Sequence, residues 1–449
     1  MEKRKLTIIG AGSAMFTQGF IMDLLNNTNG YRWHVALVDI DEAVLVSMAK
    51  LAKKMIEHKK SDVTLSYTTD RKEALADTDY VVVTIGVGGR RAWEQDVYIP
   101  RKYGVMQPVG DTAMPGGISR AMRMVPAMID IAGDVKSICP KATFLNYSNP
   151  MAIICKAISK TVDIQMTGLC IGVPGTFWYM AEVAGLPKEE CGGYWGGINH
   201  CTFIYDFRHK GKSAWHKLKA AIAGKDLTDL DEVIDPLMGD KKTKVGEPFS
   251  WWFLENHGAF LAPGDRHVTE FFTEYFPQGR YYGRILGKDA YSFEGTIAGG
   301  DEIHQSVVDI AESPEPLTES FFLRPTGEHE QLMEIICSLE NDESKIFSAN
   351  VVNNGTLPGI SSDAIVEVPC VVGAHGFKPV YQPQFPAVYA AHTNRFLSCI
   401  DVAVEAALTG NRNYLTQAIL MGGYLNDKDA AEKMTEELLA AQKEYLPQF

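Results

Sequence analysis

The stretch Lys5-Leu-Thr-Ile-Ile-Gly-Ala-Gly-Ser-Ala14 decides the fold of the first part of the chain. Its apolar run predicts a buried strand, and two glycines separated by one residue predict a tight turn before a helix. Gly10 permits the turn, and Gly12 lets the backbone approach a pyrophosphate that the helix N-terminus stabilises. Ser13 follows in the same loop, and Met15 stands where the usual G-x-G-x-x-G pattern has its third glycine. A strand–helix turn without a ligand is the alternative interpretation.

An acidic residue closes the second predicted strand. Asp39 follows Trp33–Val38, a place from which its carboxylate would accept a hydrogen bond from a ribose 2′-hydroxyl, and this favours NAD over NADP. Further strands are predicted at 63–67, 80–85 and 142–146, with Gly86 after the second of them, and helices at 16–25 and 42–58. Buried strands that alternate with helices indicate an α/β fold with a Rossmann-like, doubly wound parallel sheet.

The alternation of strands and helices weakens after about residue 195. Helical spacing dominates there, over 214–222, 394–408 and 429–445. We therefore predict two parts: an NAD-binding Rossmann-like domain in residues 1–195, and an α-rich α+β lobe in residues 196–449.

Composition narrows the class of partner. The chain has 449 residues, 43 of them basic and 56 acidic, and a net charge of −13. This balance disfavours nucleic acid and anionic membrane, because phosphate binding needs clustered lysine and arginine. No apolar run is long enough to span a bilayer. The eight cysteines are scattered without a CxxC pair, which is typical of reduced thiols, so we expect a cytoplasmic protein.

Four further stretches carry chemically useful residues. Asn146–Met151 follows the last predicted strand of the sheet, where an α/β sheet binds ligands. Cys170 lies in the Gly/Pro-rich turn 168–174, and His200 follows a glycine pair at 196–197. Polar residues open the stretch Gly264–Phe272. Taken singly, a cysteine or histidine of this kind is more often a core residue than a ligand.

Together these stretches resemble glycoside hydrolase family four, a group of NAD- and divalent-metal-dependent glycosidases. The resemblance covers most of the chain and includes Gln107–Ile118 and Val366–Pro369. It implies that Cys170 and His200 are ligands of Mn²⁺, although a thiolate is more typical of zinc or iron. Ile171 departs from the family, since many members carry histidine or asparagine after this cysteine.

The resemblance also implies a redox-assisted elimination. A hydride passes from C3 of the sugar to NAD⁺, and the resulting ketone acidifies the proton on C2. A base removes that proton, the glycosidic oxygen leaves from C1, water adds, and the hydride returns, while the metal acts as a Lewis acid. Asp265 resembles the base and Asp111 the acid, and Asn149 would contact both the sugar and the nicotinamide. Turn-forming or capping roles are the alternative for these residues.

Basic side chains are expected to bind a charge on the substrate. They are Arg91, Arg266, His267, Arg280 and Arg284. Arginine favours carboxylate, phosphate or sulfonate groups, although surface ion pairing is an equal alternative.

The expected substrate is a small glycoside, either an anionic sugar (a uronide, 6-phospho or 6-sulfo glycoside) or a neutral α-hexoside. The resemblance implies that the second lobe, residues 196–449, binds substrate and metal and mediates oligomerisation. It also implies a homodimer or homotetramer. One alternative function is an NAD-dependent 2-hydroxy-acid dehydrogenase of the lactate or malate kind. Another is a nucleotide-sensing protein without enzymatic activity.

Overall fold

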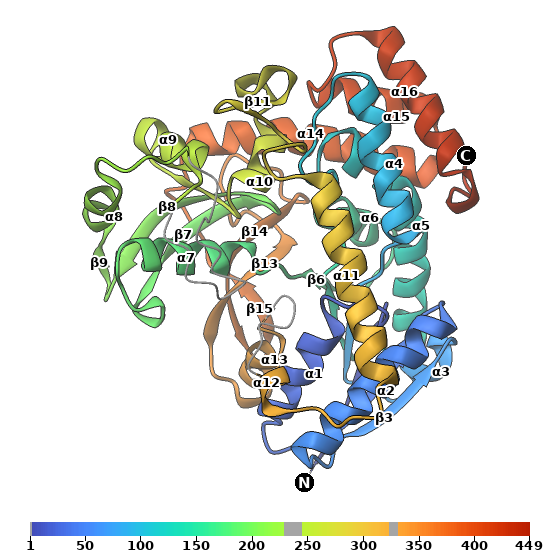
Figure 1. Ribbon diagram of the computed structural model, residues 1–449. Coiled ribbons are helices and arrows are strands. Elements are labelled where there is room, and N and C mark those ends of the chain that lie inside the picture. The colour runs from blue at the N-terminus through green and yellow to red at the C-terminus, as the bar shows by residue number, and fades with distance from the viewer. Residues whose placement is uncertain (1, 229–244, 323–330) are drawn as a thin grey trace.

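A single large sheet forms the centre of the computed structural model, which describes residues 2–228, 245–322 and 331–449. Within these residues, thirteen strands pair in the main order β10-β8-β7-β14-β13-β6-β5-β4-β1-β2-β3, with β15 on β14 and β9 on β8. Helices cover the sheet, and the chain runs from the parallel strands near the N-terminus to a helical region near the C-terminus (Figure 1).

The parallel part of the sheet is a doubly wound dinucleotide-binding fold. Its strands are β1 (Lys3–Ile9), β2 (Arg32–Val38), β3 (Thr64–Thr68), β4 (Tyr80–Val83), β5 (Thr143–Asn146) and β6 (Met166–Gly168). They pair in parallel in the order 3-2-1-4-5-6, which is the order of Rossmann folds. The intervening helices are α1 (Thr17–Asn26), α2 (Glu42–Lys59), α3 (Arg71–Leu75), α4 (Gly89–Lys102), α5 (Met114–Ile138) and α6 (Met151–Thr161). The fold class expected from the sequence is confirmed.

Antiparallel strands from the second part of the chain extend the same sheet. They are β7 (Cys191–Ile198), β8 (Cys201–His209), β9 (Lys212–Ser213), β10 (Phe260–Ala262), β13 (Lys345–Val352), β14 (Ile365–Gly373) and β15 (Gly376–Pro379). The two parts join where β13 lies antiparallel to β6, with Asn350 opposite Gly168. Most of β14 is buried, so it has no alternation of polar and apolar residues that would reveal a strand in the sequence.

Helices of the second part pack around these strands. The longer ones are α7 (Gly172–Val183), α8 (Trp215–Ile222), α9 (Pro248–His257), α11 (Phe293–Glu312), α13 (Leu332–Asn341), α14 (Ala387–Thr409), α15 (Arg412–Met421) and α16 (Lys428–Ala441). The short elements are η1 (Lys188–Glu190), α10 (Asp265–Val268), η2 (Thr269–Phe271), η3 (Thr273–Tyr275), η4 (Pro277–Gly279), β11 (Arg280–Tyr281), β12 (Arg284–Ile285), α12 (Glu319–Phe322) and η5 (Lys443–Tyr445).

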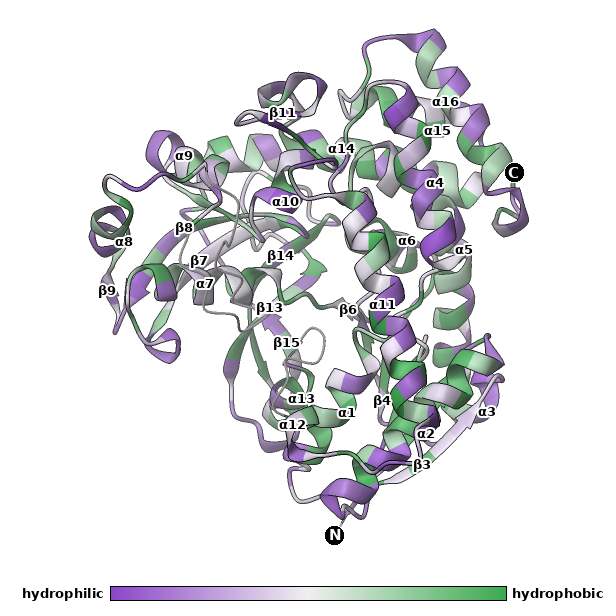
Figure 2. Cartoon of the chain, viewed as in Figure 1, coloured by the Kyte–Doolittle hydropathy of each residue, from purple (hydrophilic) through white to green (hydrophobic). Residues whose placement is uncertain are grey.

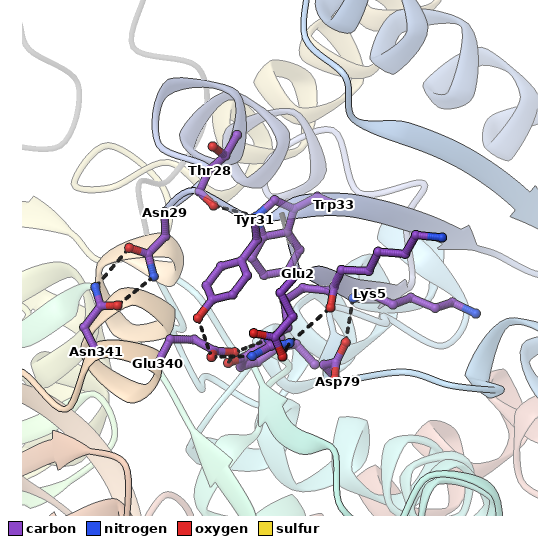
Figure 3. Close-up of polar contacts among 12 residues, drawn as sticks. Glu2, Lys5, Thr28, Asn29, Tyr31, Trp33, Asp79, Glu340 and Asn341 are labelled. Atoms are coloured by element: carbon purple, nitrogen blue, oxygen red, sulfur yellow. Dashed lines mark hydrogen bonds and ion pairs between the residues drawn. The ribbon is translucent and has the colours of Figure 1, made fainter.

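A polar cluster ties the end of α13 to the first strands. The Glu340 carboxylate accepts hydrogen bonds from Arg4 Nε and the Tyr80 hydroxyl, each at 2.6 Å. It also accepts from the Tyr31 hydroxyl at 3.0 Å (Figure 3). The Arg4 guanidinium holds the pKa of Glu340 down to about 2.

The predicted division at 195/196 falls inside β7 and remains a prediction.

Hydropathy follows the layers of the fold. Hydrophobic residues gather on the inner strands and on α5, whereas the outermost strand β3 is mainly pale to hydrophilic (Figure 2). Among the described residues we find no helix that combines the length and the hydropathy of a membrane span.

Candidate active site

The loops after four parallel strands meet at one edge of the sheet. Gly10 follows β1, Gly86 follows β4, Asn149 follows β5 and Cys170 follows β6. Because β1, β4, β5 and β6 run in the same direction, their carboxyl ends lie side by side. This edge is where open α/β sheets bind ligands.

The glycine loop has the geometry of a dinucleotide cradle. Gly10 adopts a φ of 90°, and its N–H donates to the carbonyl of Val38 at 2.8 Å. The N–H of Gly12 donates to Asp39 Oδ2 at 2.8 Å, and a Cβ on Gly12 would lie 2.6 Å from Val44 Cγ1. The loop is therefore closed to any larger side chain, as a close approach to a pyrophosphate requires.

Other features beside this loop also fit NAD. The N–H of Ser13 donates to the carbonyl of Gly10 at 3.1 Å and completes the turn. Ile40, directly after Asp39, is 93% exposed, which leaves an apolar surface next to the carboxylate expected to bind ribose. Gly86 lies exposed at the end of β4. The roles of these residues remain predictions that the geometry supports.

Asn149 connects the cofactor edge to the loop of Asp111. Its backbone carbonyl accepts from Arg120 Nε at 3.1 Å, and its side-chain Nδ2 donates to Asp111 Oδ2 at 3.1 Å. Asn149 Oδ1 is buried and finds no hydrogen-bond partner among the described residues. A buried acceptor of this kind calls for a donor, which a sugar hydroxyl or the nicotinamide amide would supply.

Cys170 and His200, thirty positions apart in the sequence, come together. Cys170 Sγ lies 3.6 Å from His200 Nε2. The N–H of Gly172, at the start of α7, donates to the sulfur at 3.3 Å, an interaction that favours negative charge on it. His200 occupies the turn between β7 and β8 with a φ of 65°. A metal bound about 2.1 Å from nitrogen and about 2.3 Å from sulfur holds the two atoms roughly 3–3.6 Å apart, so the pair fits a divalent cation.

Two more possible ligands surround this pair. The donor atoms of Asp111, His200 and His267 lie within 4.8 Å of one another, and the rings of the two histidines are 4.3 Å apart. Burial lowers the pKa of His200. Burial, together with His200 and Arg266, places the pKa of His267 well below its ordinary value. Both imidazoles are therefore neutral near pH 7, as metal ligation requires.

Asp265 is fully buried at the start of α10. Its carboxylate accepts from the N–H groups of Phe249 at 2.7 Å and Ser250 at 2.9 Å, and from the hydroxyls of Ser250 and Tyr281, each at 2.5 Å. Burial raises the pKa of Asp265, and the four hydrogen bonds oppose this shift without reversing it. These contacts are those of an aspartate that caps α9. The base role expected from the family resemblance remains a prediction.

The structure separates the predicted arginines into two groups. Arg91 pairs with Glu94 at 2.9 Å and Asp301 at 2.6 Å, and Arg266 Nη2 donates to Thr296 Oγ1 at 2.9 Å. Asp301 and Thr296 both belong to α11.

The second group lies on the β11–β12 hairpin. Arg280 contacts Gln278, and Arg284 donates to the carbonyl of Asp289 at 3.3 Å. Among the predicted basic residues, His267 joins the Asp111–His200 group, and Arg266 contributes to lowering the pKa of both histidines.

Sequence reasoning missed several supporting residues. The carboxylate of Glu270 accepts from the N–H groups of Val109 and Gly110 at 2.8 and 2.7 Å and so holds the loop of Asp111. Burial raises the pKa of Glu270 to about 8. Glu367 is buried in β14 opposite Gly197 of the His200 hairpin, and Thr112 contacts His200 directly. Glu270, Glu367 and Thr112 lie within stretches that the sequence analysis selected. The signal that could have identified them is a carboxyl or hydroxyl group among apolar neighbours.

Comparison with known proteins defines the class. The model of the family 4 glycosyl hydrolases matches residues 5–186, and the model of their C-terminal domain matches residues 195–422. The chain belongs to this family and is a glycoside hydrolase, which confirms the resemblance seen in the sequence. Membership also weighs against the 2-hydroxy-acid dehydrogenase alternative.

Individual relatives span the whole chain. An α-galactosidase of Bacillus subtilis (strain 168) is 28% identical over 457 residues, which cover 99% of this chain and 100% of that protein. A crystal structure of a 6-phospho-α-glucosidase from gut microorganisms, in complex with NAD and glucose-6-phosphate, is 24% identical with a TM-score of 0.84 and covers 100% of both chains. A second structure of a protein of that name, with NAD and Mn²⁺, is 18% identical with a TM-score of 0.82 and equal coverage. These structural likenesses show the fold.

Proposed function

We propose that this chain cleaves a small glycoside by an elimination that uses NAD and Mn²⁺. The observation that carries the proposal is the 3.6 Å separation of Cys170 Sγ and His200 Nε2, at the same sheet edge as the glycine loop. Complexes of structural neighbours with NAD and with Mn²⁺ support both cofactors. When bound, NAD⁺ supplies a hydride acceptor for C3 of the sugar, and Mn²⁺ supplies a Lewis acid for the neighbouring oxygens.

The chain's own residues orient the sugar and move protons. Asn149 Oδ1 and Arg266 Nε are a buried acceptor and a buried donor without partners among the described residues, and sugar hydroxyls would satisfy both. Asp111, held by Asn149, is the proposed acid that protonates the leaving oxygen at C1. Asp265 is the proposed base for the C2 proton. To accept that proton it must first lose a donor such as Tyr281, because four hydrogen bonds now occupy its carboxylate.

A neutral α-hexoside is the proposed substrate class. Arg91 is already bound to two carboxylates, and Arg284 contacts the carbonyl of Asp289, so neither is arranged to receive an anionic group. The α-galactosidase relative supports the same class.

We further propose that the protein is a homodimer or homotetramer of the cytoplasm. Eight free thiols support that compartment, and light scattering would measure the oligomer.

Turnover assays on the purified full chain test the proposal. Nitrophenyl α-galactoside, α-glucoside, 6-phosphoglucosides and glucuronide are each incubated with NAD⁺, Mn²⁺ and a thiol reductant. The expected result is release of nitrophenol from a neutral α-hexoside with no net NADH, and deuterium at C2 of the product formed in deuterated water. Accumulation of NADH would indicate a dehydrogenase, and hydrogen retained at C2 would exclude elimination. Cleavage of the charged glycosides alone would overturn the substrate class.

A further inference from the structure

The hydroxyl of Thr112 lies between a carboxylate and the predicted metal ligand. Thr112 Oγ1 is 2.7 Å from Asp111 Oδ1 and 2.8 Å from His200 Nδ1. The direct separation of Asp111 Oδ1 from His200 Nδ1 is 3.9 Å, which is too long for a hydrogen bond. Any influence of the carboxylate on the imidazole by hydrogen bonding therefore passes through the threonine hydroxyl.

The number of protons fixes the direction of these two hydrogen bonds. A hydroxyl has one proton to donate, and both oxygens of Asp111 act as acceptors, Oδ1 from Thr112 and Oδ2 from Asn149. The proton of Thr112 therefore goes to Asp111, and the oxygen of Thr112 accepts from His200 Nδ1–H. A neutral imidazole carries one N–H, so the lone pair of His200 is on Nε2, the nitrogen that lies 3.6 Å from Cys170 Sγ.

We propose that Thr112 is a positioning residue of the metal centre. It transmits the charge of Asp111 to His200 and fixes the tautomer and ring orientation in which Nε2 faces Cys170. The proposal rests on the proposed function, in which Cys170 and His200 bind the metal. It gives Asp111 a task that is independent of proton donation to the leaving group, because the two oxygens of its carboxylate contact different partners, Thr112 and Asn149.

The surroundings of His200 make the orientation depend on this contact. The side chain is buried in the turn of a tight hairpin and beside the ring of His267. Residues that orient a metal-bound histidine typically contribute 10–100-fold to metal affinity. Loss of the hydroxyl leaves Nδ1–H without its acceptor, and a buried unpaired donor favours rotation of the ring or the other tautomer.

Metal affinity of matched variants tests the proposal. Free Mn²⁺ is titrated by electron paramagnetic resonance in the natural chain and in Thr112→Val, Thr112→Ser and Thr393→Val. Thr393 is a buried threonine whose hydroxyl bonds only within α14 in the described contacts. We expect Thr112→Val to bind Mn²⁺ at least about tenfold more weakly, and the serine and control variants to bind within about threefold of the natural chain. NAD affinity is expected to be unchanged in all three variants.

Several outcomes would overturn the proposal. Natural Mn²⁺ affinity in Thr112→Val would show that the hydroxyl does not matter, and equal losses in the valine and serine variants would show that packing alone matters. Failure of the natural chain itself to bind Mn²⁺ would instead remove the proposed metal function.

A second measurement needs no folded Thr112 variant. Nitrogen-15 spectra of metal-free natural protein, with His200 assigned by comparison with His200→Gln, should show the proton on Nδ1. A proton on Nε2 would overturn the proposal.

Discussion

Replacement of Glu367 by glutamine should stabilise the protein above pH 7 and leave its stability nearly unchanged at pH 5. Glu367 is buried in β14 opposite Gly197 of the His200 hairpin. Its Oε2 lies 2.8 Å from Thr202 Oγ1, which itself lies 3.0 Å from the carbonyl of Ile198. Thr202 has one proton, so a protonated Glu367 satisfies the group best: it donates to Thr202, which donates to Ile198. A glutamine N–H can make the same donation.

The size of the effect follows from the pKa of this carboxyl. Burial raises the pKa of Glu367 from 4.5 to about 7. A pKa that is higher in the folded state contributes stability that is complete below the unfolded value and is lost as pH rises through the folded value. At about 1.4 kcal/mol per pKa unit, roughly 3 kcal/mol is lost between pH 4.5 and 7. Glutamine does not titrate, so the variant escapes this loss.

Urea denaturation at pH 5, 6, 7 and 8 measures the difference between the natural chain and Glu367→Gln. The free energy of unfolding of the variant should rise relative to the natural chain over this range and level off near pH 8. Glu255→Gln, on the exposed side of α9, is the control and should follow the natural chain at every pH. Parallel stability curves for the natural chain and Glu367→Gln would refute a neutral, buried Glu367.

Three further substitutions test the cofactor loop, the Cys170–His200 pair and the buried Asp96–Arg123 ion pair. Gly12→Ala places a Cβ 2.6 Å from Val44 and should weaken NAD binding by more than about tenfold, as measured by fluorescence titration; an unchanged affinity would contradict the cradle. Cys170→Ser should abolish Mn²⁺ binding and turnover but keep NAD binding, and natural rates in this variant would end the metal assignment. Asp96→Ala leaves Arg123, whose side chain is 1% exposed, without its carboxylate and should lower the free energy of unfolding by about 3–5 kcal/mol. A change below about 1 kcal/mol in denaturant titration would show that the pair contributes little.

The parallel half of the fold could be predicted because its signals are local. The run ending at Ile9, the turn at Gly10 and the acid at Asp39 each specify a strand end or a turn through neighbouring residues. The antiparallel half depends on partners far away in the sequence. Strand β14 pairs with β13, β15 and β7, and its mostly buried residues carry no period by which to recognise it.

In the site, too, the types of residue could be predicted from the sequence, whereas their surroundings could not. The residues Cys170 and His200 could be selected from their motifs, and the structure brings them together. The buried environment of Asp265 could not be predicted, because its donors come from Ser250 and its neighbour in α9 and from Tyr281 on a separate hairpin. Hydrogen-bond saturation is a property of the assembled fold, and the sequence around Asp265 carries no sign of it.

The pairing of β6 with β13 sets how the catalytic groups can move. Asn350 sits opposite Gly168, two residues before Cys170, so the cofactor loops and the histidine hairpin belong to one continuous hydrogen-bonded ladder. A hinge between the halves would have to break that ladder, which makes rigid-body opening and closing costly. We therefore expect substrate entry and product exit to rely on rearrangement of surface loops. Changes of sugar specificity would then arise by exchanging those loops, while the spacing between hydride acceptor and cation stays constant.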